Sequence, residues 1–193
     1  MPTKASLPKV KLLHVTTRAA WRAWLKANYK SRTEVWLVYY RKSTGKPRLA
    51  YNDAVEEALC FGWIDSLVRS IDQDRFAQRF SVRKPGSRYS QANLERLRAL
   101  VRHRRVRRDV LPTLPDLSES DFQIPADILQ AIRANRRAWK HFRGFSPAYI
   151  RIRTAFIDGA RRRPAEFLKR LAHFIRETEA NRQFGFGGIE KYY

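Results

Sequence analysis

Apolar residues near the start of the chain recur at helical spacing and then give way to a continuous hydrophobic run. The recurring positions predict a helix that Thr16 or Thr17 caps and that ends near Tyr29; they are Ala20, Trp21, Trp24, Leu25 and Ala27. The run at residues 34–40 is rich in β-branched and aromatic side chains, which predicts a buried strand.

A second helix is predicted from Asn52 or Asp53, either of which can serve as its cap. Its apolar face comprises Val55, Ala58 and Leu59. Glu56 and Glu57 are expected to point outward as a solvated pair that interacts favourably with the helix dipole. Gly62 is expected to end the helix in the left-handed conformation.

Residues 64–71 and 75–82 predict two further strands joined by a turn at residues 72–74, and Ser90 is expected to open a third helix. In the second of these strands, Phe76 and Phe80 fall on one side. Three short strands in one meander favour an antiparallel sheet with helices packed on one face.

The second half of the chain reads as helical. Residues 111–125 contain three prolines and have the composition of a linker. Short helical segments follow at 126–134 and 135–143, and Ser146-Pro147 is typical of a cap followed by proline at the first helical position. A final amphipathic face comprises Phe167, Leu168, Leu171, Ala172, Phe174 and Ile175.

These elements predict an α+β protein. Residues 1–110 are expected to form a domain with a small antiparallel three-stranded sheet packed with helices. Residues 111–125 are expected to be a linker, and residues 126–193 an all-helical region.

The net charge is the feature of the composition that adds most to this prediction, because it bears on the partner of the protein. The chain has 40 Lys and Arg against 18 Asp and Glu, a formal charge of +22. Residues 1–100 hold 20 basic and 8 acidic side chains, and residues 101–193 hold 20 and 10, so both halves are basic. Self-repulsion of this size suggests an anionic small molecule or nucleic acid as partner, although arginines on solvated faces explain the composition equally well.

Cysteine content and hydropathy indicate the cellular compartment of the protein. The single Cys60 allows no internal disulfide, and its neighbours Leu59 and Phe61 favour a buried, inert thiol. No apolar run approaches the ~20 residues of a membrane span, and the N-terminal residues lack the apolar core of a signal peptide. A cytoplasmic protein is expected.

Familiar catalytic and metal-binding patterns are missing from the sequence. The 4 histidines are scattered, and neither a Cys-x-x-Cys pair nor a Gly-x-Ser-x-Gly elbow occurs. The Gly-rich tail lacks the features of a phosphate loop. The sequence therefore predicts no metal and no cofactor, and it favours a non-catalytic protein.

The strongest local signal for a ligand is the basic loop that precedes the third predicted helix. Arg83, Lys84 and Arg88 lie beside Ser87 and Ser90, where the free N–H groups of a helix start favour an anion. In the alternative interpretation, either serine is a plain cap and the cations are solvated.

Trp63 and Asp65 have two similar interpretations. Trp63 is either a core residue or a stacking wall, and Asp65 is either the partner of an arginine or the orienting acid of a pocket. Nucleic-acid contacts are expected from the arginines at 102–108 and 161–163. Such binding would lack sequence preference, because no known recognition motif is legible.

A resemblance to a known family rests on two sets of residues. In the first half they are Trp21, Trp24, Leu25, 35–37, Tyr51, Ala54, Val55, 58–66, Arg83, 85–87, Tyr89, Ser90 and Asn93. In the second half they are Ile124, Pro125, Asn135, Ala138, Trp139, Phe142, 145–147 and Tyr149. With these residues the chain resembles the bacterial YdeI/OmpD-associated family, also labelled bacteriocin-protection proteins, over most of its length.

The resemblance implies a link to envelope stress and to resistance against bacteriocins or antimicrobial peptides, and it implies no catalytic mechanism. The chain departs from the family pattern at Tyr89, at the arginine run 102–108 and at residues 164–166. When residues of the family motif in the first half are added, the candidate ligand-binding residues are Trp63, Asp65, Arg83, Lys84, Ser87, Tyr89, Ser90 and Asn93.

The sequence thus favours a cytosolic, non-catalytic binding protein with affinity for anionic ligands or nucleic acid. The alternative is an enzyme that acts on an anionic small molecule in a pocket near Trp63, Asp65 and Arg83.

Overall fold

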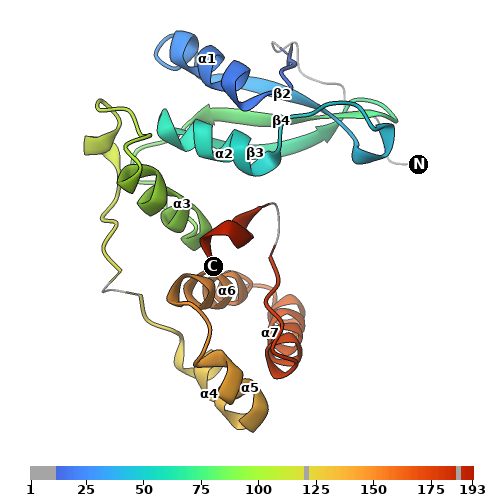
Figure 1. The fold of residues 1–193 in the computed structure, drawn as a ribbon, viewed down its shortest axis with the longest axis vertical. Coiled ribbons are helices and arrows are strands. Elements are labelled where there is room, and N and C mark those ends of the chain that lie inside the picture. The colour runs from blue at the N-terminus through green and yellow to red at the C-terminus, as the bar shows by residue number, and fades with distance from the viewer. Residues whose placement is uncertain (1–11, 120–121, 186–187) are drawn as a thin grey trace. The chain divides into compact units, whose positions relative to one another are not determined.

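The computed structural model describes residues 12–119, 122–185 and 188–193, so the expectations for residues 1–11 lie outside the described residues. The chain divides into two compact units (Figure 1). The sheet unit comprises residues 1–87 and 100–115, and the helical unit comprises residues 88–99 and 116–193.

The sheet unit confirms the α+β class but corrects the strand count and order. Among the described residues the sheet has four strands, β1 (Leu12–Leu13), β2 (Glu34–Tyr40), β3 (Trp63–Ser70) and β4 (Arg75–Val82). The order β1-β2-β4-β3 is not a meander, because β4 lies between β2 and β3. The long connection from β2 to β3 lets β3 occupy the outer position, and the two-residue β1, parallel to β2, is too short to leave a pattern.

Two helices of the sheet unit differ in how their N-termini are capped. The hydroxyl of Thr17 accepts a hydrogen bond from the Ala20 N–H at 3.2 Å and caps α1 (Arg18–Asn28), as predicted. Helix α2 (Tyr51–Cys60) starts before the predicted caps, and its N-cap residue, Ala50, makes no side-chain cap bond. Gly62 follows α2 with φ of 73°, which confirms the left-handed position.

Both helices pack on one face of the sheet. Side chains alternate along a strand, so Val35 of β2 and its partner Phe80 of β4 share a face. Trp21 of α1 lies 5.3 Å from the Phe80 ring, and its indole N–H donates to the Ala54 carbonyl of α2 at 3.0 Å. This buried bond fixes the two helices against each other above the sheet.

The opposite face holds a smaller cluster, formed by Trp36, Val38 and Ala77 with Ile71 beside it. The Arg69 guanidinium lies 5.4 Å above the Trp36 ring. A shift in strand register between Asp65 and Val68 interrupts the pairing of β3 with β4. Leu67 and Val68, at this irregularity, are 53% and 58% exposed.

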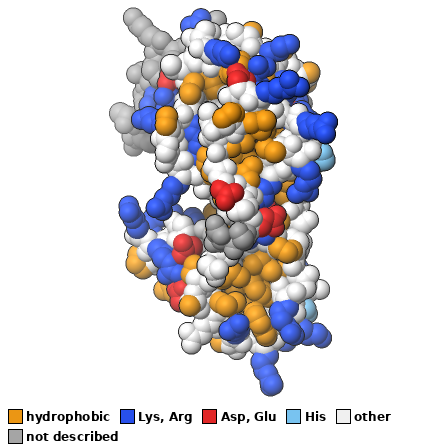
Figure 2. All heavy atoms as spheres, turned by 90° about the vertical axis from the view of Figure 1, so that its left-hand side faces the viewer, with side chains coloured by type: hydrophobic (Ala, Val, Ile, Leu, Met, Phe, Trp, Pro, Cys, Tyr) orange, Lys and Arg blue, Asp and Glu red, His pale blue; other side chains and the backbone are white. Residues whose placement is uncertain are grey.

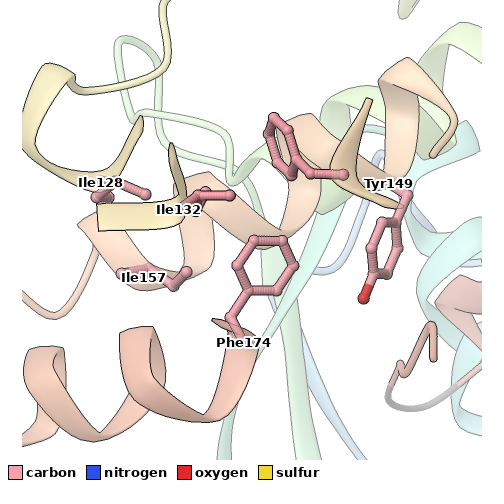
Figure 3. Close-up of a cluster of buried hydrophobic side chains, with 6 residues drawn as sticks. Ile128, Ile132, Tyr149, Ile157 and Phe174 are labelled. Carbon is pink, nitrogen blue, oxygen red and sulfur yellow. The ribbon is translucent and has the colours of Figure 1, made fainter. Parts of the chain in front are cut away.

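The helical unit contains the first part of α3 (Gln91–Arg102) and four further helices: α4 (Ala126–Ala134), α5 (Arg136–Phe142), α6 (Pro147–Asp158) and α7 (Pro164–Glu179). Ser146 caps α6 through a bond from the Tyr149 N–H at 3.1 Å, with Pro147 at the first helical position, as predicted. The buried core comprises Ile128, Ile132, Phe142, Tyr149, Ile157 and Phe174 (Figure 3).

A buried carboxylate joins three parts of the sheet unit. The Glu57 side chain on α2 is 0% exposed and accepts from the Arg18 Nε at 2.6 Å, the Arg22 Nη1 at 2.5 Å and the Arg105 Nη2 at 2.6 Å. Arg18 also pairs with Asp53 at 2.7 Å and with Glu56 at 2.9 Å. The cluster thus connects α1, α2 and the segment after α3.

The expectation that Glu56 and Glu57 point outward is therefore wrong. Both residues are buried, at 2% and 0% exposure. Guanidinium groups from distant parts of the sequence satisfy their oxygens, and this makes burial of the carboxylates tolerable. The local pattern of α2 carries no information about those arginines.

We predict that Glu57→Gln destabilises the protein by about 3 kcal/mol, because it leaves arginine charges without their buried counter-ion. The Arg22 and Arg105 side chains remain 38% and 41% exposed, which keeps the cost at the lower end. Urea unfolding measures the change. Glu166→Gln, which removes a less buried pair with Arg170 within α7, is the control and should have a much smaller effect. Equal effects of the two substitutions would contradict a structural role for Glu57.

Cys60, the last residue of α2, is buried as expected. Burial and the nearby Glu57 raise the pKa of its thiol to about 11, although Arg22 and Arg105 act in the opposite direction. Since the thiolate is the reactive form, the thiol is largely unreactive at neutral pH.

We predict that a thiol reagent labels Cys60 in the folded protein far more slowly than in denaturant. Cys60→Ala should cost on the order of 1 kcal/mol, as expected for a small core truncation. Labelling kinetics at pH 7 with and without denaturant make the comparison. Equal rates would show that the thiol is accessible in the native state.

Candidate anion-binding site

Trp63 is placed as a core residue. It opens β3, is 0% exposed, and lies edge-on to Trp24 of α1 with ring centroids 5.9 Å apart. Its indole N–H donates to the Tyr29 carbonyl at 3.4 Å. The strand places the ring between the sheet and α1, so its burial serves the packing of this unit.

Asp65, two residues further along β3, is half-buried and lies on the same side of the strand. Its carboxylate accepts from the Tyr51 hydroxyl at 3.1 Å and from the Gln78 amide at 2.7 Å. Tyr51 begins α2 and Gln78 belongs to β4. The carboxylate therefore holds a helix start to the sheet.

The basic loop after β4 forms a hydrogen-bonded turn. The Arg83 Nη2 donates to the Ser87 carbonyl at 2.8 Å, and the Ser87 hydroxyl donates to the Lys84 carbonyl at 2.6 Å. Gly86, with φ of 71°, occupies the left-handed position of the turn. Lys84 is exposed. Arg83 thus shapes the turn, and Lys84 presents its charge to solvent.

The remaining candidate residues belong to the other unit, because the division falls between Ser87 and Arg88. The Ser90 hydroxyl accepts from the Asn93 N–H at 3.3 Å and caps α3, as predicted. The Asn93 side chain is 9% exposed and accepts from Arg96 at 3.0 Å. Tyr89 is half-buried.

The arginine run 102–108 has two roles that the sequence does not separate. Arg105 binds Glu57, and Arg107 pairs with Asp109 at 3.0 Å. Their neighbours Arg102, Arg104 and Arg108 are exposed. Part of the run therefore serves the fold of the sheet unit, and part contributes to its positive surface.

A second buried carboxylate organises the helical unit, and sequence reasoning missed it. Glu95 of α3 is 5% exposed and accepts from Arg151 of α6 at 2.6 and 3.1 Å, from Arg98 at 2.6 Å and from Gln91 at 2.9 Å. Burial opposes the charge, but the bonds from Arg151 and Gln91 outweigh it and lower the pKa of Glu95. The carboxylate thus stays ionised and ties α3 to α6.

The end of the helical unit formed by α4 and α5 is strongly cationic. Its exposed basic side chains are Arg133, Arg136, Arg137, Lys140 and Arg143. Residues 133–143 contain no Asp or Glu. Figure 2 shows Lys and Arg side chains on this lower part of the molecule, around an apolar area. The absence of acidic residues is visible in the sequence, but sequence reasoning gave it no weight.

In the parts of the chain that the structure describes, no group of three or more His, Cys, Asp and Glu side chains is placed to hold a metal ion. Within the same residues, no helix is both long and apolar enough to cross a bilayer. The prominent side chains available to a ligand are the exposed cations.

Comparison with known proteins finds family models that match two segments of the chain. Residues 13–112 match the model of a domain of unknown function (DUF8412), and residues 121–181 match the family described as bacteriocin-protection, YdeI or OmpD-associated. The resemblance at Ile124–Tyr149 is thereby confirmed, whereas the motif residues of the first half fall under the other model. No curated protein and no solved structure matches the chain. The first match covers just over half of the chain, so the chain belongs to the family of this domain of unknown function, and a segment of its second half is similar to the YdeI- or OmpD-associated bacteriocin-protection family.

Proposed function

We propose that this protein is a non-catalytic binding protein for anionic ligands, with nucleic acid as the main class. The observation that carries the proposal is the placement of the cations. Buried carboxylates such as Glu57 and Glu95 are committed to the fold, while five exposed basic side chains at residues 133–143 face solvent with no Asp or Glu in that stretch. An anionic partner would relieve the resulting repulsion.

The partners of Trp63 and Asp65 support binding over catalysis. An orienting acid would hold a group that acts on substrate, whereas Asp65 accepts hydrogen bonds from Tyr51 and Gln78, which join the start of α2 to the sheet. The indole of Trp63 lies in the core rather than against solvent. These contacts favour the binding protein over an enzyme that acts on an anionic small molecule.

The family description adds protection against bacteriocins to the proposal. A chain with a net charge of +22 repels cationic peptides, so we place its protective role at an anionic target rather than in peptide capture. The single cysteine fits a reducing compartment, and we place the protein in the cytoplasm.

We predict that the protein binds heparin and DNA at about 50 mM salt and that binding weakens linearly in a plot of log affinity against log salt concentration. Oligonucleotides of unrelated sequence but equal length should bind with similar affinity, because phosphate contacts carry no sequence information. Retention on heparin and fluorescence anisotropy with labelled DNA test this. A protein that flows through heparin at that salt concentration and leaves the anisotropy of labelled DNA unchanged would overturn the proposal.

The turn at residues 83–87 is proposed as a separate contact for small anions. Lys84→Gln should reduce the rise in melting temperature that phosphate produces at constant ionic strength. Arg83→Ala should instead lower the melting temperature to a similar extent with and without phosphate, because it removes the bond to the Ser87 carbonyl. If Lys84→Gln leaves the phosphate effect intact, the turn is not an anion contact.

A further inference from the structure

We propose that the α4–α5 end of the helical unit is a binding surface for single-stranded nucleic acid, with Trp139 at its centre. This inference rests on the proposed affinity for anionic ligands and assigns it a place and a partner. We define the α4–α5 surface by the side chains of Arg133, Arg136, Arg137, Trp139, Lys140 and Arg143.

Trp139 holds two arginines of this surface over its ring. The guanidinium carbons of Arg133, on α4, and Arg143, after α5, lie 5.0 and 5.8 Å from the indole centroid. Among the described residues, neither arginine forms an ion pair with a carboxylate. Cation–π contact restrains the two side chains, so they lose less conformational freedom when a phosphate binds.

The indole is itself anchored by the core. Trp139 is half-buried, packs against the core of the helical unit, and stacks on Phe142 with ring centroids 5.7 Å apart and an interplanar angle of 23°. The planar guanidinium groups that this fixed, partly exposed ring holds over it offer flat surfaces on which an unpaired base can stack.

Helical spacing places two further cations, Arg136 and Lys140, on the same side of α5 as Arg143. Arg136 and Lys140 are four residues apart on α5, and Lys140 is three residues before Arg143, so the three lie on one side of the helix. Like charges at these spacings destabilise an isolated helix. A carboxylate does lie nearby: Glu179 of α7 accepts from the Asn135 amide at 3.1 Å. One carboxylate leaves most of the five cations available to a phosphate backbone.

The combination of cations and an aromatic centre favours a single strand over a duplex. In a duplex the bases are stacked on one another, and a surface helix reaches mainly the phosphates. In a single strand the base faces are available, so aromatic stacking adds to phosphate contact. The α4–α5 surface should therefore bind single-stranded DNA or RNA more tightly than a duplex of the same length.

Fluorescence anisotropy of a labelled 12-nucleotide single strand, and of the same strand in a duplex, tests the proposal with the full chain. Arg133→Gln combined with Arg143→Gln should weaken single-strand binding by about tenfold or more and should make the salt dependence less steep. The matched control is Arg176→Gln with Arg182→Gln, which removes the same charge from exposed positions in the same unit, where both side chains pair with Glu177, and should have a smaller effect.

Trp139 variants separate stacking from charge. Trp139→Leu keeps an apolar side chain in the core and should lower single-strand affinity by about tenfold while leaving duplex affinity nearly unchanged. Trp139→Phe retains an aromatic face and should preserve most of the preference for the single strand. Circular dichroism and thermal melting identify any variant that fails to fold. If a Trp139 variant fails to fold, the double variant of Arg133 and Arg143 tests the proposal.

The outcomes distinguish the proposed role of the α4–α5 surface from the more general proposal that the protein binds anionic ligands. If the wild-type chain binds no polyanion, the proposed function fails and this inference fails with it. If the chain binds DNA but both arginine pairs weaken binding equally, binding is diffuse and only the α4–α5 surface is rejected. Equal wild-type affinity for single strand and duplex rejects the stacking role of Trp139.

Discussion

The contact between Glu57 and three arginines is the interaction on which the sheet unit most depends. It brings together α1, α2 and the segment beyond α3, which are distant in sequence, at a carboxylate that is 0% exposed. With 18 carboxylates for 40 cations, the position of each acidic residue matters. The helical unit has the same arrangement, since Glu95 joins Arg98 and Arg151 in its interior. Each unit thus uses a buried carboxylate to hold arginines that would otherwise repel one another.

The burial of these acidic residues affects the charge of the protein surface. Buried carboxylates such as Glu57 and Glu95 are not available to balance the surface, and stretches such as residues 133–143 remain cationic. Charge at the surface is therefore linked to charge in the core. The fold uses part of the small number of carboxylates in the interior, and this leaves the surface more positive.

Much of the local structure is predictable from sequence because its causes are local. Thr17, Ser90 and Ser146 each accept from a backbone N–H three residues ahead, and such caps are legible from a few neighbouring residues. The failures share a different cause. The burial of Glu56 and Glu57 depends on arginines far away in sequence, and the position of β4 between β2 and β3 depends on pairing between distant strands.

The same division applies to the candidate site. The helix start at Ser90 is legible from the sequence, whereas the contacts of Trp63 with Tyr29 and of Asp65 with Tyr51 and Gln78 are not. Trp139 enters the sequence argument only through the family resemblance. Its contact with Arg133 depends on how α4 and α5 fold back on one another, which residue spacing does not show, whereas Arg143 lies four residues further along the same helical turn.

The register shift in β3 has a consequence for how the protein behaves in a crowded solution. An outer strand leaves a row of backbone N–H and C=O groups open, and such a row is a template for strand addition by another chain. The irregularity between Asp65 and Val68 breaks the spacing of that row just where Leu67 and Val68 are in water. An incoming strand would lose its match there, so these apolar side chains can remain on the rim of the sheet without promoting fibril growth.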